Sequence, residues 1–433
     1  MPDFDILIIG GSAAGSNAAV AARKLYPDKS IAVLRREEAA VIPWHIYKAM
    51  RDEESLRKQA MPDTIYARNG VTLLISEATA LDRQAKTVEL SDGQRLGYDR
   101  LVLATGSSPL VPRLPGVDLP GVFPVRKSIP HLAAMREALA RASSLGIIGG
   151  GFVGVEFASE LGCRDGLQVT LVEMLPRCLA VAFDESMSGR AESLLRENGV
   201  EILTQTRVAA ILGADRSEAV RLADGKEFPA DVVLLAVGER PETQLGGASG
   251  LPLGACGGFV VDDRMRTPDP SVFAAGDCAE KTSFFGEASC PLRTATIAAA
   301  EARIAAANLY GDGPRDPGTI EAYSTTICGA GFMTVGLNEG TALGLGRDVA
   351  VGVAENPDAR VKLLFDRNTA DLVGFQGMGH LPATLVDRLL TALRTSTSLA
   401  TVAEDPAAAL PSVTDAGLLA LIAQAAEAAR AEL

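Results

Sequence analysis

The sequence reads ILIIGGSAAG from residue 6 to residue 15 and LGIIGGGFVG from residue 145 to residue 154. In each stretch a short apolar run leads directly into a glycine-rich loop. The first loop is followed by an alanine-rich segment to about Leu25 and an apolar run at 31–34, and the second by a helical segment and an apolar run at 168–172. Strand, glycine loop, helix and strand make the βαβ unit that binds dinucleotides, so the sequence predicts an α/β protein with two Rossmann-like domains.

The second loop has glycine at the first, third and sixth positions, which are Gly149, Gly151 and Gly154. These positions provide the tight turn, the close approach of the backbone to a pyrophosphate, and the contact between helix and strand. Phe152 and Val153 open the helix, whose free N–H groups and positive dipole end favour a bound phosphate. One such motif is a weak signal, but two of them, each within a βαβ unit, indicate two dinucleotide sites.

Glu173 ends the strand that follows the second loop, nineteen residues after Gly154. A carboxylate at this place can accept hydrogen bonds from the diol of an adenine ribose. Met174 and Leu175 come next, with no arginine beside Glu173 to meet a 2′-phosphate. The sequence therefore favours NADH over NADPH, and the alternative is that Glu173 is only a solvated acid at a strand end.

The first loop departs from the usual pattern at two places. Ser12 stands at the position of the middle glycine, and Arg35 occupies the position where an acid usually contacts the ribose. A serine is small enough to lie beside a pyrophosphate, but the loss of the acid weakens the usual ribose contact. Glu37 or Glu38 can substitute for it, and the alternative is that this half of the protein binds no nucleotide.

A further glycine segment reads SVFAAGD from residue 271 to residue 277. Its Asp277 can hydrogen-bond a ribityl hydroxyl, and a helix that begins near Thr294 can direct its N-terminus at the electron-rich edge of a flavin ring. The alternative for Asp277 is a plain helix cap or turn residue. Two more segments, 101–106 and 232–238, resemble each other and lie at similar distances after their own glycine loops, which indicates that a whole domain is duplicated.

The last hundred residues have a different character. From Tyr323 onward apolar and polar residues alternate, as at 360–365 and 372–376, and the chain closes with helices rich in leucine and alanine. Alternation of this kind fits an antiparallel sheet that is covered on one face. The sequence therefore predicts a separate C-terminal α+β domain.

The chain has 433 residues and a formal net charge of −13 at pH 7. Its length suits two or three domains, each large enough for an apolar core. The negative charge would repel a phosphate backbone or an anionic membrane surface, so neither nucleic acid nor a membrane is an expected partner. The apolar stretch 4–22 lacks the basic start of a signal peptide, and no segment has enough uninterrupted apolar residues to cross a bilayer.

The six cysteines are scattered without a CxxC pair. This distribution is typical of a reducing, cytoplasmic setting, and it predicts neither a disulfide framework nor a metal site. We interpret the cysteines as small buried hydrophobic residues, and only Cys278 and Cys290 lie close to predicted site residues. His131 and His380 have no motif around them and are interpreted as structural.

Together these motifs resemble the FAD-dependent pyridine-nucleotide–disulfide oxidoreductase family, in particular its branch of CoA-disulfide reductases, NADH oxidases and NAD(P)H sulfur reductases. The likeness covers nearly the whole chain and is carried by residues 8–15, 98–107 with Pro109, 149–156, 172–177, 238–241, 273–277 and 365–377. The resemblance implies a homodimer formed through the C-terminal domain. It also implies that NADH gives a hydride to the flavin N5 and that the reduced flavin passes electrons to a substrate on its other face.

The resemblance further implies a discontinuous FAD-binding domain at 1–115 and 245–320, an NAD-binding domain at 116–244 and a C-terminal dimerisation domain at 321–433. Contacts to FAD are expected from Gly10, Ser12, Ala13, Ala14, Gly15, Arg35, Pro43, Ala78, Ala104, Thr105, Gly106, Gly276, Asp277, Thr294 and Ala295. Contacts to NADH are expected from Gly149, Gly151, Phe152, Val153, Gly154, Glu173 and Gly238.

One stretch departs from the family. Relatives carry a segment Pro-Cys-Gly-x-Pro-Tyr, whose single cysteine sits over the flavin and cycles between a thiolate and oxidised forms. The aligned stretch here is VIPWHIYK, residues 41–48, with Trp44 at the cysteine position and no cysteine within the first 162 residues. This difference puts in doubt the reduction of CoA disulfides or persulfides by the usual thiolate route.

Three interpretations of this stretch stay open. In the first, Trp44 plugs the thiol pocket and leaves a protein that oxidises NADH slowly with oxygen. In the second, Trp44, His45, Tyr47 and Lys48 form a new catalytic pocket with an aromatic wall, a proton-transferring histidine and a cation. In the third, one-electron carrier proteins dock near the flavin, as in the family's cysteine-free ferredoxin and rubredoxin reductases. Each of these side chains taken alone is better explained by packing or by solvation, and only their joint placement makes a functional role equally plausible.

We therefore predict an FAD-dependent NADH oxidoreductase that reduces a non-disulfide acceptor, whether a small molecule, oxygen or an electron-carrier protein. The alternative is a flavin-bound redox sensor or scaffold with little turnover, whose redox state changes partner binding. The rate at which NADH bleaches the flavin separates the two, because only the enzyme needs fast reduction.

Overall fold

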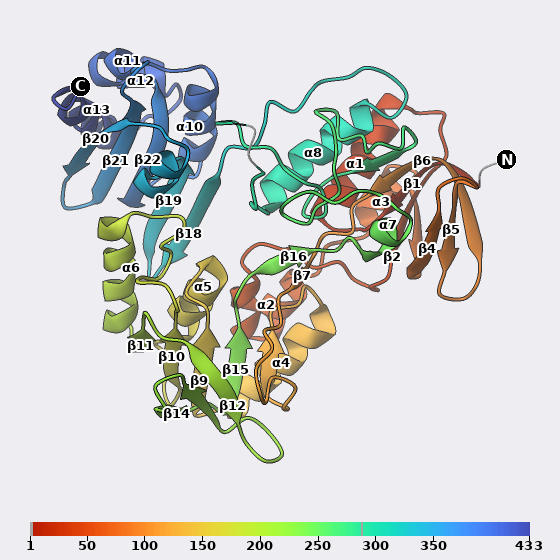
Figure 1. Ribbon diagram of the computed structural model, residues 1–433, viewed down its shortest axis with the longest axis horizontal. Helices are drawn as coiled ribbons and strands as arrows, with labels where there is room; N and C mark the ends of the chain where they lie inside the picture. The colour runs from red at the N-terminus through yellow and green to blue at the C-terminus, as the bar shows by residue number, and fades with distance from the viewer. Residues whose placement is uncertain (1–2, 287–288) are drawn as a thin grey trace. The chain divides into compact units, whose positions relative to one another are not determined.

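The computed structural model describes residues 3–286 and 289–433 (Figure 1). The chain forms two compact units. Unit 1 consists of Met1–Leu110, Pro124–Arg141 and Gly238–Thr319, and unit 2 consists of Val111–Phe123, Ala142–Val237 and Ile320–Leu433. Both units contain parallel or antiparallel sheets with helices against them, so the predicted α/β class is confirmed.

Unit 1 is built on a parallel sheet. Its strands run in the order β3 (Thr72–Ile75), β2 (Ile31–Arg35), β1 (Phe4–Ile9), β6 (Arg95–Leu103) and β17 (Val272–Ala274). Every residue of β2 is buried, as expected for a central strand whose two faces are both covered. The antiparallel strands β5 (Thr87–Leu90) and β4 (Ala78–Asp82) continue the sheet from β6.

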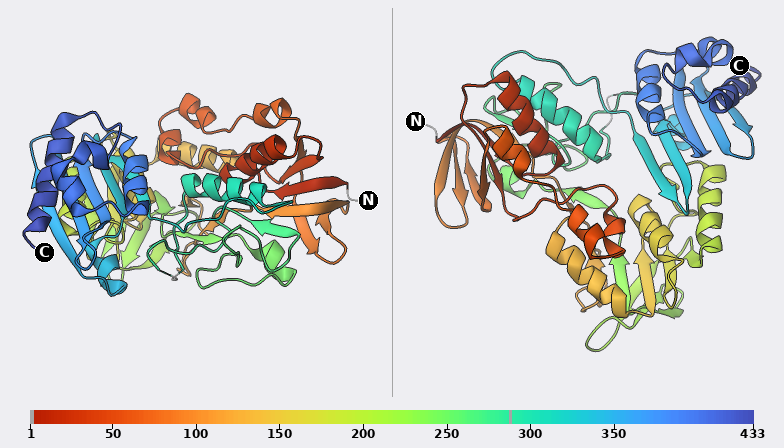
Figure 2. Two further views of the ribbon diagram at one scale, coloured as in Figure 1. Left: turned by 90° about the horizontal axis from the view of Figure 1, so that it is seen from above. Right: turned by 180° about the vertical axis from the view of Figure 1, so that it is seen from behind.

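Two helices cover one face of this sheet side by side, α1 (Ala13–Leu25) and α8 (Ala295–Ala307) (Figure 1; Figure 2). Their shared core consists largely of alanines, among them Ala18, Ala22 and Ala302. Small side chains let the two helix backbones approach closely. Helix α1 begins directly after the first glycine loop, so this packing fixes the direction in which its N-terminus points.

The other face of the sheet, to which Tyr98 of β6 contributes its buried ring, packs on α7 (Gln244–Ala248) and on Phe259. The remaining elements of unit 1 are short, apart from α4 with its 13 residues. They are the 3-10 helix η1 (Ile46–Met50), helices α2 (Glu53–Lys58), α3 (Thr64–Arg68) and α4 (Ile129–Arg141), and strands β7 (Ser107–Pro109) and β16 (Glu239–Pro241).

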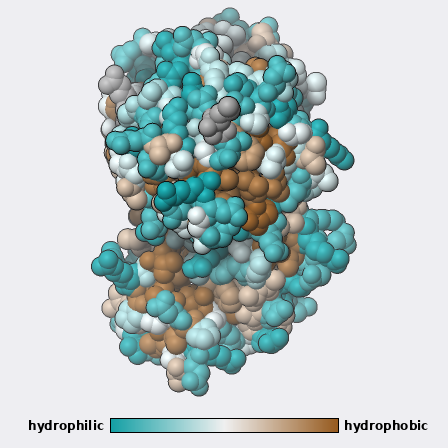
Figure 3. All heavy atoms as spheres, turned by 90° about the vertical axis from the view of Figure 1, so that its right-hand side faces the viewer, coloured by the Kyte–Doolittle hydropathy of each residue, from teal (hydrophilic) through white to brown (hydrophobic). Residues whose placement is uncertain are grey.

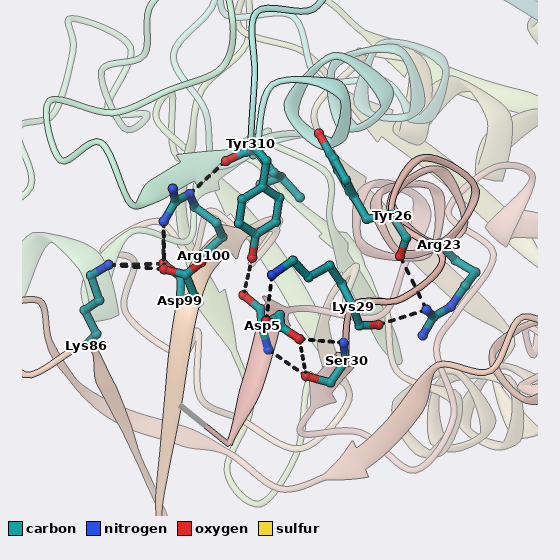
Figure 4. A network of polar contacts seen from close by, with 10 residues as sticks. Asp5, Arg23, Tyr26, Lys29, Ser30, Lys86, Asp99, Arg100 and Tyr310 are labelled. Carbon is teal, nitrogen blue, oxygen red and sulfur yellow. Dashed lines mark hydrogen bonds and ion pairs between the residues drawn. The ribbon is translucent and has the colours of Figure 1, made fainter. Parts of the chain in front are cut away.

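A polar network closes the end of the sheet at which β1 and β2 begin (Figure 4). Tyr310 follows α8 and donates a hydrogen bond to the Asp5 carbonyl at 3.1 Å. Lys29 Nζ and the Arg100 guanidinium carbon each lie 4.8 Å from the centroid of its ring. The Asp5 carboxylate also accepts hydrogen bonds from Lys29 and Ser30. These contacts join the end of α8 to the sheet on the side opposite the glycine loop, because that loop follows the carboxyl end of β1.

Unit 2 contains the second glycine loop. Its five-stranded sheet has the order β11 (Val200–Leu203), β10 (Gln168–Val172), β9 (Ser144–Ile148), β15 (Val232–Leu235) and β8 (Val122–Pro124). The first four strands are parallel. Helices α5 (Phe152–Leu161) and α6 (Glu185–Glu197) and the antiparallel strands β12 (Val208–Leu212), β13 (Ala219–Leu222) and β14 (Glu227–Pro229) complete this part.

The C-terminal part of unit 2 is an antiparallel sheet, as the alternating sequence pattern predicts. Its order is β18 (Ala322–Ile327), β19 (Ala330–Gly336), β22 (Leu372–Gly379), β21 (Ala359–Asp366) and β20 (Val349–Glu355). Helix α13 (Ala416–Arg430) packs on β20 and β21. The shorter helices are α9 (Glu339–Gly344), α10 (Leu385–Arg394), α11 (Leu399–Glu404) and α12 (Pro406–Ala409).

The surface in Figure 3 is largely hydrophilic, with hydrophobic residues gathered in a few patches. Large apolar side chains that remain exposed include Trp44, Met174, Val181 and Leu343. Among the described residues, no helix has both the length and the apolar character that a bilayer crossing requires.

Candidate functional site

The first glycine loop is shaped by close backbone contacts. Gly10 has a φ of +112°, and a Cβ there would lie 2.0 Å from the Ala104 carbonyl oxygen. A Cβ on Gly15 would lie 1.8 Å from the Gly10 carbonyl oxygen, and one on Gly276 would lie 2.8 Å from the Ala14 Cβ. No side chain fits at these three positions. The loop, the end of β6 and the segment after β17 therefore meet at one place, as the sequence predicts.

The N-terminus of α1 opens toward this place. Ser12 is the N-cap residue, but its side chain does not cap the helix and instead donates to the Val41 carbonyl at 3.4 Å. Ala13 and Ala14 form the first turn with small side chains. The N–H groups of this turn are thus left for another acceptor, and helix α1 is long enough to add its dipole. This arrangement fits the pyrophosphate of a dinucleotide.

The side chain of Arg35, at the usual position of a ribose-binding acid, is bonded to other groups of the protein. Its side chain is 2% exposed and forms a bidentate ion pair with Asp63, with N–O distances of 2.6 and 2.9 Å. The hydrogen bond to Asp63 raises the pKa of Arg35. Glu37 and Glu38 contribute their backbone carbonyls to the same guanidinium. A contact between the Arg35 side chain and a ribose is therefore not supported by this geometry.

The Arg35 side chain also packs against Gly11, where a Cβ would lie 2.8 Å from its Cδ. On another side of the loop, the Tyr66 hydroxyl donates to the Gly11 carbonyl at 2.8 Å, and burial raises the pKa of Tyr66 to about 12. Asp63 and Tyr66 belong to the α3 region and carry no motif. The sequence offered no signal for their role in shaping the loop.

Asp277 lies in a cluster of polar side chains at the end of β17. Its Oδ2 accepts hydrogen bonds from Ser107 Oγ at 2.7 Å and from Lys127 Nζ at 3.3 Å. Burial opposes ionisation, but the charge of Lys127 and the hydrogen bond from Ser107 outweigh it and lower the pKa of Asp277. Both bonds use the same oxygen, and within the described part of the chain Oδ1 accepts no hydrogen bond, so it fits the predicted contact to a ribityl hydroxyl.

The backbone of Gly276 is held by a buried ion pair. Glu301 of α8 accepts a hydrogen bond from the Gly276 N–H at 2.8 Å, and Lys281 donates to the Gly276 carbonyl at 2.7 Å. The two side chains are 3% and 2% exposed and lie 3.2 Å apart. Sequence reasoning missed both residues, because neither belongs to a recognised motif.

The other expected FAD contacts surround the same end of the sheet. Thr294 caps α8 by accepting from the Ile297 N–H at 3.4 Å, and Ala295 is the first residue of the helix. Thr105 donates to the Glu242 carbonyl through its hydroxyl at 2.5 Å. Gly106 has a φ of +76° and open space at its Cβ, and Ala78 begins β4. Pro43 lies in the loop between Val41 and η1.

The stretch 41–48, where the resemblance predicts the family's cysteine, forms a loop followed by the 3-10 helix η1. Trp44 is 54% exposed, so it does not serve as a packing residue of unit 1. His45 adopts a left-handed conformation with a φ of +58°, which is strained for a residue with a side chain. Its Nδ1 lies 3.1 Å from the hydroxyl of the buried Tyr47, and Lys48 Nζ lies 5.8 Å from the Tyr47 ring centroid. Four neighbouring residues thus present an aromatic surface, an imidazole–phenol pair and a cation.

None of the six cysteines belongs to this stretch of the sequence. All six are free. Cys278 is buried and donates to the Leu103 carbonyl, and burial raises the pKa of its thiol. Cys290 is buried as well, and burial also raises the pKa of Cys256. Among the described residues, no group of histidine, cysteine and acidic side chains could hold a metal ion.

The second glycine loop repeats the geometry of the first. Gly149 has a φ of +109°, and its Cβ would lie 2.4 Å from the Ala236 carbonyl oxygen. A Cβ on Gly154 would lie 1.9 Å from the Gly149 carbonyl oxygen, whereas Gly151 faces open space as the uncapped N-cap of α5. The duplication that the sequence predicts therefore extends to the backbone contacts of the loop.

Glu173 is bonded to the second loop itself. Its carboxylate accepts from the Gly150 N–H at 2.6 Å and from the Leu175 N–H at 2.7 Å. Each carboxylate oxygen can accept more than one hydrogen bond, so these contacts orient Glu173 without excluding a ribose. Cys178 packs against Gly150 beneath the loop, and burial raises the pKa of its thiol to about 12.

The ring of Phe152 stacks on Tyr323 of β18, with 4.5 Å between the ring centroids. A contact of Phe152 with NADH would therefore come from its backbone N–H at the start of α5. Val153 is exposed at the same turn. Gly238, also expected to contact NADH, belongs to unit 1, where its carbonyl accepts from the Leu110 N–H. His131, interpreted as structural, is bonded to the Pro124 carbonyl at 2.7 Å.

Two glycine loops, each tied to the end of a neighbouring strand, together with an acid after β17, define a flavoprotein oxidoreductase with two dinucleotide sites. A family model described as pyridine nucleotide-disulphide oxidoreductase matches residues 4–302, and the chain belongs to this family. It is an FAD-dependent NADH oxidoreductase.

Comparison with known proteins supports this assignment. The chain is 31% identical to an NADH oxidase of Methanocaldococcus jannaschii over 317 residues, which cover 70% of each chain. It is 32% identical to a putidaredoxin reductase of Pseudomonas putida over 347 residues, which cover 78% of this chain and 81% of the relative. The structure of an NAD-dependent persulfide reductase from A. fulgidus superposes with a TM-score of 0.89 at 28% identity, covering 99% of this chain and 83% of that chain.

Proposed function

We propose that the protein passes electrons from NADH through FAD to an acceptor that is not a disulfide, at a site where Trp44 replaces the family's redox cysteine. The observation that carries the proposal is that Trp44 is 54% exposed. Its loop is bonded to the first glycine loop, because the Ser12 hydroxyl donates to the Val41 carbonyl. An exposed indole offers a planar face to a ligand or partner but no thiolate.

The neighbouring residues have the chemistry that such an acceptor needs. Burial, with a contribution from the charge of Lys48, lowers the pKa of His45, so its ring is neutral near pH 7. Nδ1 of this neutral ring lies 3.1 Å from the Tyr47 hydroxyl. In the tautomer with the proton on Nε2, the ring can donate a hydrogen bond to a bound acceptor while keeping its proton, and the protons that a reduced acceptor takes up then come from solvent. Lys48 supplies positive charge beside the pair. Bound FAD supplies the ability to accept a hydride and to release electrons singly or in pairs.

Rapid mixing of the flavin-loaded protein with NADH under anaerobic conditions tests the proposal. We expect fast loss of the oxidised flavin absorbance, followed by its return when oxygen, a quinone or a carrier protein of the ferredoxin class is added. CoA disulfide should not restore it. Fast reoxidation by CoA disulfide in the wild-type protein would show that the acceptor site is not the one proposed.

Two substitutions at one position sharpen this test. Trp44→Cys restores the family's thiol, and Trp44→Phe keeps an aromatic face of the same kind. We expect Trp44→Phe to retain more activity with a planar acceptor than Trp44→Cys. If the two variants and the wild type had equal activity with every acceptor, Trp44 would have no role in the acceptor site.

A flavin-bound sensor is the second candidate function. The observation in its favour is the same exposed tryptophan, since exposed aromatic side chains are common in surfaces that bind proteins. A sensor needs no fast turnover. Flavin bleaching by NADH that takes minutes or longer would favour it over the enzyme.

Cofactor choice and assembly are part of the proposal. Glu173, held by two backbone N–H groups, supports NADH over NADPH because a 2′-phosphate would meet a carboxylate. The C-terminal sheet is proposed to form a homodimer, which light scattering on the purified protein would test. A reducing, cytoplasmic location is proposed from the six scattered cysteines, which form no disulfide among the described residues.

A further inference from the structure

Lys127 lies in the segment between β8 and α4, outside every motif that the family assignment uses. Its ammonium group makes three contacts, one for each of its protons. The partners are Ser107 Oγ at 3.0 Å, Glu239 Oε2 at 3.1 Å and Asp277 Oδ2 at 3.3 Å. All four residues belong to unit 1.

The cluster brings two carboxylates together around one cation. Ser107 Oγ lies 2.7 Å from Glu239 Oε2 and also 2.7 Å from Asp277 Oδ2. A hydroxyl has a single proton, so Ser107 can donate to only one of the two acids at a time. The ammonium of Lys127 is therefore the group that can satisfy both carboxylates at once.

The cluster is shielded from solvent, which makes its charge balance matter. The side chains of Lys127, Glu239 and Asp277 are 27%, 28% and 15% exposed. Two ionised acids that share one hydroxyl repel each other, and one of them must then take up a proton or move away. Burial opposes the charge of Lys127, but Glu239 and Asp277 outweigh it and raise the pKa of Lys127, so the cation persists at neutral pH.

We infer that Lys127 is a positioning residue for FAD binding: it neutralises Glu239 and Asp277 together and thereby holds Asp277 with Oδ1 toward the ribityl chain. This inference rests on the proposed binding of FAD by unit 1. Lys127 itself needs no contact with the flavin. Lys127 acts on FAD binding by positioning Asp277. The cation is needed because Glu239 places a second negative charge beside Asp277.

The test measures FAD affinity of the holoprotein by serial dilution, following the return of free flavin fluorescence. Lys127→Met should weaken FAD binding by about tenfold or more, the usual scale for losing charge-assisted hydrogen bonds. Lys127→Arg should recover part of the loss. Lys86→Met removes another lysine of unit 1, one that is 41% exposed and lies 3.5 Å from Asp99, and should leave the affinity within about twofold of wild type.

A second substitution separates positioning from general stability. If repulsion between the two acids is the cause, Glu239→Gln combined with Lys127→Met should restore most of the FAD affinity, although no bond is added back. If Lys127 only stabilises unit 1, the double variant should bind FAD no better than Lys127→Met. Circular dichroism melting of each variant shows whether it is folded.

The outcomes are distinct. A wild-type protein that binds no FAD would overturn the proposed function together with this inference. A wild-type protein that binds FAD, with a folded Lys127→Met variant of equal affinity, would overturn only the role of Lys127. Failure of Glu239→Gln to rescue the variant would likewise exclude the positioning role.

Discussion

The buried pair of Glu301 and Lys281 predicts how the stability of unit 1 depends on pH. Glu301 is 3% exposed and accepts the Gly276 N–H on the segment that carries Asp277. Burial raises the pKa of Glu301 from 4.5 to about 7, even though Lys281 acts in the opposite direction. The carboxyl group therefore holds its proton in the folded protein over a pH range in which the unfolded chain has lost it.

The sign follows from proton linkage. Between about pH 5 and pH 7 the folded state binds one more proton than the unfolded state at Glu301, so the free energy of unfolding falls as the pH rises. The difference between 4.5 and about 7 corresponds to at most about 3 kcal/mol. Because the pair with Lys281 shares this effect, we expect a loss of about 1–3 kcal/mol between pH 5 and pH 8.

Glu301→Gln removes the titrating group and keeps an oxygen that can accept the Gly276 N–H. Urea unfolding at pH 5 and pH 8 measures the effect, followed by the fluorescence of Trp44, the single tryptophan of the chain, which lies in unit 1. Wild type should lose about 1–3 kcal/mol more than the variant over this range. Glu89→Gln, on the exposed side of β5, should behave as wild type. Parallel pH dependence of wild type and Glu301→Gln would refute the assignment of the titration to Glu301.

Three further substitutions test separate parts of the structure. Asp63→Asn leaves the buried Arg35 guanidinium without its counter-ion and should cost about 1–3 kcal/mol of unit 1 stability, less than for a fully buried pair because Asp63 is 42% exposed; an unchanged urea midpoint would contradict this. Glu173→Ala should reduce the ratio of kcat/KM for NADH to that for NADPH by about tenfold, and an unaltered ratio would separate Glu173 from cofactor choice. Tyr310→Ala removes the ring between two cations and should lower the free energy of unfolding by about 1–3 kcal/mol, whereas a loss below about 0.5 kcal/mol would mean that the network is not stabilising.

Much of the fold follows from local sequence. The apolar runs of β1, β2, β9 and β10 are short and continuous because both faces of these strands are covered. The glycine loops are equally local, since Gly10 and Gly149 require positive φ values and leave no room for a Cβ. A residue type that a position demands for steric reasons is visible in the sequence without knowledge of its partners.

The role of Trp44 is only partly local. The family resemblance leads us to expect a cysteine at the position of Trp44, and this expectation rests on the sequence alone. The exposure of Trp44 and the contact between His45 and Tyr47 depend on the turn at His45. This residue has a left-handed conformation, which the sequence does not predict because the position holds neither glycine nor asparagine. The sequence predicted that the stretch 41–48 differs from the family pattern. It did not predict how the side chains of this stretch are arranged.

What the sequence by itself determined is the pair of glycine loops and the family, and it predicts that Trp44 stands in place of the family's thiol. What only the tertiary structure decided is which charges surround those loops. Arg35 pairs with Asp63, and Lys281 pairs with Glu301. Lys127 contacts both Glu239 and Asp277, which are far from it in the chain. The physical reason is that a side-chain ion pair leaves no periodicity and restricts neither partner's backbone, so its existence depends on where folding brings the two charges.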